Sequence, residues 1–184
     1  MEKKNIYILV IVLALVGAGS GLGIYYGLIL SKPSEEQEIL TIYGSGVTGN
    51  HSMTMTELQS TKYIQVTNQE FITKNFEGVI VSNGYYSGVS LRSILEEENL
   101  LEPDAKYYTG IGGDGYNPGA MWGMLNISDV MNNDYNLCII AYGGTDFDPL
   151  EDGTLKLMIN QSIVDISIRA SRYCVSMLTS IFIE

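Results

Sequence analysis

The sequence predicts an α+β fold of mostly β mixed sheets with short helices, preceded by one transmembrane helix. Two observations support this prediction. An uncharged run covers residues 6–30, close to the N-terminus. After it, short β-rich runs and short helices intermingle without the regular strand–helix alternation of a doubly wound sheet. A chain of 184 residues has room for one domain with appendages.

The uncharged run predicts a membrane anchor. As a helix it would span ~37 Å at ~1.5 Å per residue, enough to cross a hydrocarbon core of ~30 Å. Lys3 and Lys4 precede it, which favours a cytoplasmic N-terminus and an extracytoplasmic C-terminus. A cleaved signal peptide is the alternative, with residues 17–20 as a small-residue cleavage site. We therefore expect an anchor at residues 1–31, a linker at 32–38 and a domain at 39–184.

Three glycines of the anchor, Gly19, Gly23 and Gly27, fall four residues apart on one helix face. Small residues at this spacing let two membrane helices approach closely, so a homodimer through this face is one expectation. Glycine is also frequent in membrane helices in general, which is the simpler interpretation.

The net charge of the chain limits the classes of molecule that it is expected to bind. The chain carries 10 Lys and Arg against 21 Asp and Glu, a formal net charge of −11. Such a surface repels phosphate backbones, so nucleic-acid binding is not expected. The single histidine, His51, excludes an all-histidine metal site.

Local patterns predict the elements of the domain in order. Thr54 and Glu57 form a capping-box pattern for a short helix through Leu58. Ser90 is the expected cap of a helix that buries Leu91, Ile94 and Leu95. Asn126 or Ser128 is expected to cap a helical turn through Met131. Strands are predicted at residues 39–43, 63–67, 79–82, 107–111, 137–142, 155–159 and 173–183.

Four segments in this order resemble the oxidoreductase molybdopterin-binding domain, the fold of the catalytic part of sulfite oxidases. They are an opening strand and turn, an aromatic-Ser-Gly-Val-x-Leu helix start, an Asp-Gly-Tyr loop and a hairpin ending in Asp-Gly-Thr-Leu-Lys-Leu, at residues 40–58, 86–95, 114–116 and 137–157. The resemblance covers nearly the whole domain and implies that fold. It also implies a pocket for a molybdopterin cofactor, lined by Thr67, Asn68, Asp114, Gly115 and Tyr116.

The sequence departs from the family at the metal. Catalytic members ligate molybdenum through a cysteine thiolate, and the matching stretch here, residues 63–69, contains none; Thr67 or a neighbour takes its place. A hydroxyl is a poor substitute for a soft thiolate. The arginines that hold the pterin phosphate and an anionic substrate are also missing. We therefore expect no catalytic residues and no metal, and no molybdenum in particular, whereas a retained pterin is left open.

Other residues each have two interpretations. Asp114-Gly115-Tyr116 lines a ligand pocket or forms a tight turn that anchors Tyr116. Trp122 stacks on a ligand or is ordinary core, and His51 contacts a ligand or lies in an exposed loop. Cys138 and Cys174 form a disulfide or stay free and buried. Asp146, Asp148, Glu151 and Asp152 bind calcium or belong to a hairpin turn. Asn50, Asn126 and Asn160 begin Asn-x-Ser triplets, which suit a surface protein.

Three functions follow from these patterns. The first is a membrane-anchored extracytoplasmic domain that binds a small ligand or a protein partner without catalysis. The second is a molybdopterin-dependent oxidoreductase with an atypical metal site. The third is a structural surface protein that dimerises through its anchor. The sequence favours the first, on the cell membrane with a single span.

Overall fold

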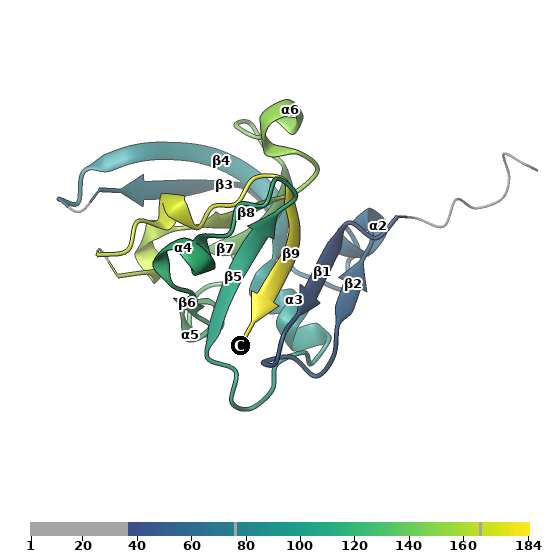
Figure 1. Ribbon diagram of the computed structural model, residues 1–184. Helices are drawn as coiled ribbons and strands as arrows, with labels where there is room; N and C mark the ends of the chain where they lie inside the picture. Colours follow the sequence, from purple (N-terminus) through teal and green to yellow (C-terminus); the bar gives the residue numbers. More distant parts are fainter. Residues whose placement is uncertain (1–36, 76, 166) are drawn as a thin grey trace, which may run out of the picture. The chain divides into compact units, whose positions relative to one another are not determined.

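The computed structural model describes residues 37–75, 77–165 and 167–184, which form one compact unit. The predicted anchor, its glycine face and most of the predicted linker lie outside the described residues. Within the part of the chain that is described, no helix is both long and apolar enough to cross a membrane. The fold of the unit is α+β with mixed sheets and short helices, as the sequence predicts (Figure 1).

One sheet has five strands in the order β2-β1-β9-β5-β6. It is mixed, because β1 pairs with β9 in parallel while its other pairs are antiparallel. The first and the last strand of the described residues therefore lie side by side. The strands are β1 Leu40–Tyr43, β2 His51–Met53, β5 Tyr107–Gly112, β6 Leu125–Asn126 and β9 Leu178–Ile183.

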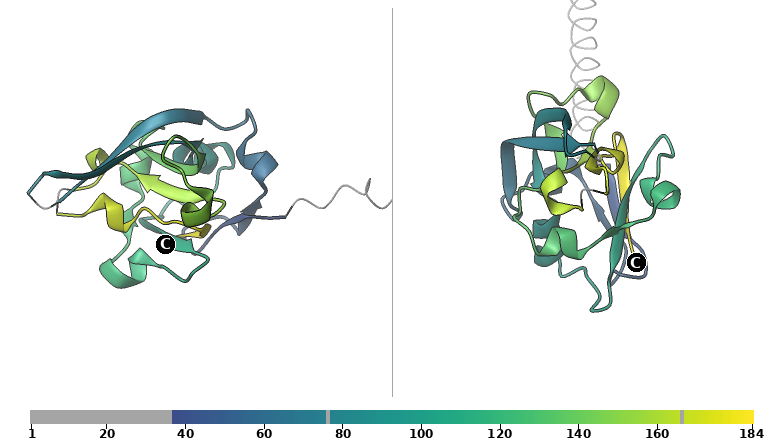
Figure 2. Two further views of the ribbon diagram at one scale, coloured as in Figure 1. Left: turned by 90° about the horizontal axis from the view of Figure 1, so that it is seen from above. Right: turned by 90° about the vertical axis from the view of Figure 1, so that its left-hand side faces the viewer.

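The other sheet has four antiparallel strands in the order β3-β4-β7-β8. Its first two strands form a long hairpin that extends away from the rest of the unit as a curved arm (Figure 1 and the left view of Figure 2). The strands are β3 Gln65–Lys74, β4 Ile80–Ser90, β7 Cys138–Gly143 and β8 Lys156–Ile159.

Short helices join the strands, and two of the predicted caps are confirmed. Thr54 and Glu57 form both hydrogen bonds of a capping box, and the Ser90 hydroxyl accepts the Ser93 N–H, so β4 runs directly into a helix. The helices are α2 Met55–Leu58, α3 Leu91–Glu97, α4 Pro118–Trp122, α5 Ser128–Met131, α6 Pro149–Asp152, and the 3₁₀ turns η1 Gln161–Ile163 and η2 Ala170–Arg172.

The main core lies between the two sheets and α3. Ile42, Ile94 and Ile140 are fully buried in it. A smaller cluster covers the other face of the four-stranded sheet and includes Ile139, the neighbour of Ile140 in β7. Strand β7 is thus buried on both faces, which confirms the prediction drawn from its continuous apolar run.

Several predictions of elements are wrong. The predicted strand at 173–183 begins only at Leu178, because the preceding residues follow a 3₁₀ turn and Met177 has a φ of +52°. Helix α5 follows Ile127 with no side-chain cap. His51 lies in β2, paired with Ile42, and not in an exposed loop. The strands of the hairpin extend well beyond the predicted residues 63–67 and 79–82. Their added residues are mostly polar and give no strand signal in the sequence, but backbone hydrogen bonds between the two strands hold them in the sheet.

Candidate functional site

Thr67 and Asn68 form a bulge in β3. The pairing of β3 with β4 shifts between Val66 and Gln69, and Asn68 has a φ of +48°, in the left-handed region that asparagine tolerates. The Asn68 N–H donates to Ser87 Oγ at 2.8 Å, and its Oδ1 accepts the Thr145 hydroxyl at 3.1 Å. Both side chains are exposed, so the bulge presents a hydroxyl and an amide to solvent.

Asp114, Gly115 and Tyr116 form a tight turn after β5. Gly115 has a φ of +88°, Asp114 Oδ1 accepts the Tyr116 N–H at 3.0 Å, and the Gly112 N–H donates to Tyr116 O at 2.9 Å. The Tyr116 hydroxyl donates to Arg172 O at 2.6 Å, and its ring packs on the main core. Burial raises the pKa of this phenol. The turn therefore anchors Tyr116, which was one of its two interpretations.

The two groups of residues come from different sheets. Thr67 and Asn68 belong to the four-stranded sheet, whereas Asp114, Gly115 and Tyr116 follow a strand of the five-stranded sheet. Among the described residues, no hydrogen bond or ring contact links one group to the other. Their order along the chain does not reveal this, because it leaves the assignment of strands to sheets undetermined.

A recess opens on the outer face of the four-stranded sheet. Its volume is about 190 Å³, and segment 171–176 forms its rim. Thr73, Tyr86, Lys156 and Met158 come from the sheet, while Ser171, Cys174 and Ser176 come from the rim. We call this hollow the Lys156 recess. Three hydroxyls, a phenol, a thiol and an ammonium line it, a set suited to hydrogen bonds with a small polar molecule.

Lys156 is the cation of this recess and is largely buried. Its side chain is 16% exposed, and Nζ lies 2.6 Å from Asp152 Oδ1 and 5.2 Å from the centroid of the Tyr86 ring. Asp152 also accepts bonds from the Ser176 hydroxyl and the Asp148 N–H. Burial is the largest single influence and lowers the pKa of Lys156, but the bond to Asp152 and the electrostatic effects of Tyr86, Asp152 and Cys174 together outweigh it, so the pKa is raised. The ammonium therefore stays charged at neutral pH, with donors left over for a ligand.

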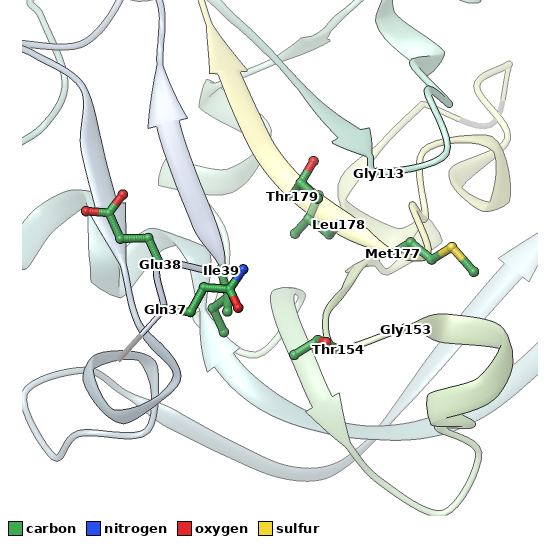
Figure 3. A pocket seen from close by; sticks show the side chains of 9 residues that line it. All are labelled: Gln37, Glu38, Ile39, Gly113, Gly153, Thr154, Met177, Leu178 and Thr179. Atoms are coloured by element: carbon green, nitrogen blue, oxygen red, sulfur yellow. The ribbon is translucent and has the colours of Figure 1, made fainter. Parts of the chain in front are cut away.

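A second pocket of about 380 Å³ lies between the start of β1 and the start of β9 (Figure 3). Gln37, Glu38 and Ile39 line one side, and Met177, Leu178 and Thr179 another. Gly113, Gly153 and Thr154 complete the lining, so the pocket reaches the predicted loop only at the residue before Asp114.

Trp122 lies on the surface, which corrects the expectation that it belongs to the core. Its side chain is 44% exposed at the end of α4. One face carries the Arg172 guanidinium at 4.9 Å, and Tyr116 approaches edge-on at 6.2 Å between ring centroids. A Cβ at the neighbouring Gly123 would also meet nothing within 4 Å.

Three of the four carboxylates of the acidic loop form bonds within the protein. Asp146 accepts the Tyr85 N–H, Asp148 accepts the Leu150 N–H at the start of α6, and Asp152 binds Lys156. Within the described ranges, no group of three or more His, Cys, Asp or Glu side chains could hold a metal ion.

The thiols are free, so of the two interpretations offered the disulfide is not formed. Cys138 is 3% exposed in β7, near the Tyr108 hydroxyl, and burial raises its pKa to about 12. Burial also raises the pKa of Cys174, whose thiol donates to Ile159 O. Neither belongs to the bulge at Thr67, where a hydroxyl and an amide stand. This donor set does not fit molybdenum, which takes soft thiolate ligands.

Comparison with known proteins adds information on the fold. No known protein family matches the sequence, and no curated protein matches it. Among solved structures, the sulfane dehydrogenase SoxCD from Paracoccus pantotrophus is similar, with a TM-score of 0.55 and 14% sequence identity. The match covers 83% of this chain and 39% of the SoxCD chain. The chain therefore shares its fold with part of an oxidoreductase and spans well under half of that protein's length.

Proposed function

We propose that the protein is a single-pass membrane protein whose folded part, residues 39–184, lies outside the cytoplasm and binds a small polar ligand without molybdenum chemistry. The uncharged run at residues 6–30 behind Lys3 and Lys4 supports the tether. The fold shared with part of a sulfane dehydrogenase supports descent from an oxidoreductase scaffold. Fold alone does not assign activity, so the residues of the site decide the rest.

The groups available at the bulge in β3 support the non-catalytic part of the proposal. In catalytic members of the family the matching segment holds the cysteine that ligates molybdenum. Here it offers Thr67 and Asn68, and Asn68 is hydrogen-bonded to the hydroxyls of Ser87 and Thr145. Both thiols lie elsewhere, protonated and packed. Hydroxyl and amide groups hold polar ligands by hydrogen bonds but do not supply the thiolate that molybdenum needs.

The Lys156 recess is the proposed ligand position. The residues that the family resemblance assigns to a pterin pocket come from two sheets, whereas this recess gathers one ammonium and several hydroxyls in one hollow. Asp152 accepts one of the three Lys156 donors, so a ligand carboxylate or oxyanion can accept another. Asp152 neutralises the charge of Lys156, so hydrogen bonds from the ammonium and the hydroxyls would hold the ligand rather than a net positive charge.

Metal content tests the non-catalytic part. Molybdenum and tungsten are measured by mass spectrometry in full-length protein purified from its native membrane. We expect far less than one atom of either metal per chain. A near-stoichiometric amount would overturn the proposal and establish the enzyme.

Ligand-induced stabilisation tests the recess. Acetate and sulfate are titrated into the full-length protein against chloride at equal ionic strength, and the unfolding temperature is followed. A ligand present at 100 times its Kd stabilises the folded state by about 2.7 kcal/mol. We expect stabilisation in the wild type and in Lys62→Met, which removes an exposed lysine, but not in Lys156→Met/Asp152→Asn. The double variant removes both members of the ion pair and leaves no unpaired buried charge. Equal stabilisation in all three proteins would refute the recess.

A molybdopterin-dependent oxidoreductase is the second candidate, and two observations favour it. The chain shares its fold with part of a sulfane dehydrogenase, and the thiol of Cys174 lines the Lys156 recess. If the metal measurement supports this candidate, Cys174→Ser tests the thiol: loss of bound metal in that variant would identify it as the ligand, and full retention would exclude it.

Self-association through the anchor is a separate proposal. Gly19, Gly23 and Gly27 present one small-residue face on the predicted membrane helix. Isoleucine at Gly19 and Gly23 would keep two such helices apart. We expect a weaker signal from this variant in a membrane association reporter, and an unchanged signal would retire the interface.

A further inference from the structure

The three Asn-x-Ser triplets differ in the accessibility of their asparagines. Asn50 and Asn126 are exposed, whereas Asn160 is 8% exposed. The Asn160 side chain is also fully engaged, since Nδ2 donates to Glu70 O at 3.2 Å and Oδ1 accepts the Ser162 N–H at 3.1 Å as the cap of η1. A bulky group on Nδ2 of Asn160 would break this packing, whereas the other two asparagines are exposed. A side chain at Gly49, beside Asn50, would meet nothing within 4 Å.

The two accessible asparagines lie at opposite edges of the same sheet. Asn50 immediately precedes β2, and Asn126 is the last residue of β6. In the order β2-β1-β9-β5-β6 these are the two outer strands. Edge strands expose backbone donors and acceptors that pair with other chains unless something covers them. The chain separates these two triplets by more than 70 residues, and only the fold shows that both lie at sheet edges.

We propose that Asn50 and Asn126 carry N-linked glycans that shield the two edges of the five-stranded sheet, and that Asn160 stays unmodified. This inference rests on the proposed extracytoplasmic placement, because glycans are added to Asn-x-Ser on that side of the membrane. The donor is a lipid-linked oligosaccharide phosphate. The amide nitrogen Nδ2 forms a bond to the anomeric carbon, the bond from that carbon to the phosphate oxygen breaks, and the phosphate leaves with the electron pair while Nδ2 loses a proton.

In each accessible triplet the serine is either exposed or forms a contact with one neighbouring side chain. Ser128 is exposed, and Ser52 Oγ lies 3.3 Å from Thr41 Oγ1, which is half-buried. The serine variants therefore provide a test that leaves each asparagine in place. Ser52→Ala should abolish the modification of Asn50, and Ser128→Ala that of Asn126.

The experiment uses the full-length protein from its native membrane. Gel mobility and peptide mass spectrometry compare the wild type with Asn50→Gln, Asn126→Gln, the double variant and Asn160→Gln. We expect one mobility step lost in each of the first two, both lost in the double variant and none lost in Asn160→Gln. Wild-type mobility of the double variant, or a glycan on Asn160, would overturn the assignment. The serine variants must reproduce the asparagine result, and failure to do so would also count against it.

Two further measurements separate the parts of the inference. Light scattering should show more self-association in the double variant than in the wild type, and equal association would refute the shielding role. Protease added to intact cells reports the placement independently. Degradation of the domain with both asparagines unmodified would refute glycosylation and leave the placement standing. Protection until the cells are lysed would refute both.

Discussion

Substitution of Gly88 by alanine tests how closely β4 and β7 approach. Gly88 belongs to the Gly-Val-x-Leu motif and lies opposite Ala141 of β7. A Cβ at Gly88 would lie 2.2 Å from Ile140 O and 2.6 Å from Ala141 Cα. Ordinary contacts of this kind begin at 3.4 Å, so the two strands would have to separate by about 1.2 Å at this point.

The expected cost is near the upper end for overpacking. Extra methyl groups in a well-packed core cost about 1–3 kcal/mol, and more where nothing can move. The atoms facing Gly88 are backbone atoms of a strand that is buried on both faces, so they cannot rotate away. We therefore expect a loss of about 3 kcal/mol, or roughly 6–12 °C in unfolding temperature for a domain of this size.

Gly143 provides the matched control in the same strand pair. A side chain there would meet nothing within 4 Å, and its φ is not positive. Gly143→Ala should be neutral or stabilising by about 0.4–1 kcal/mol, because it restricts the unfolded chain. Urea unfolding of residues 37–184, followed by circular dichroism, compares the two variants. Equal stability of Gly88→Ala and Gly143→Ala would refute the packing of β4 against β7.

Three more predictions follow from the fold. Residues 37–184 should unfold cooperatively on their own, and a broad, non-cooperative melt would contradict a self-sufficient core. Cys138 should resist an aqueous thiol reagent at pH 8 and react after denaturation, because it is 3% exposed and burial raises its pKa to about 12; fast labelling of Cys138 in the native protein would be the opposite result. Bonds from Lys62 and Tyr63 lower the pKa of Glu98, so its stabilisation is present above its ordinary pKa and lost as the pH falls through the lowered value. Stability measured between pH 6 and 3 should therefore fall more in the wild type than in Lys62→Met, and parallel curves would refute this.

Interactions between residues close together in the chain could be predicted from the sequence. The capping box at Thr54 and the cap at Ser90 involve residues three apart, so the pattern contains the whole interaction. The apolar run of β7 predicts its burial on both faces for the same reason. The α+β class follows from the irregular order of such elements, and the similarity to part of SoxCD supports the resemblance read from four segments at the level of the fold alone.

The candidate site depends on contacts between residues that are far apart in the chain. Thr67 and Asn68 were grouped with Asp114, Gly115 and Tyr116 because a family pattern places them together. Here the first two lie in β3 of the four-stranded sheet, whereas the other three follow β5 of the five-stranded sheet. The Lys156 recess was missed, since its lining comes from β3, β4, β8 and segment 171–176. One sequence signal was available: Asp152 and Lys156 are four apart, a spacing typical of an ion pair, although only the fold shows that this pair is buried.

The sequence by itself determined the elements with local signals, the acidic character of the chain and the absence of a thiol in residues 63–69. Tertiary structure alone decided the parallel pairing of β1 with β9, the exposure of Trp122 and the burial of Asn160. The reason is physical. Caps and apolar runs act within a few residues, whereas pairing and burial depend on which distant segment supplies the other half of each contact.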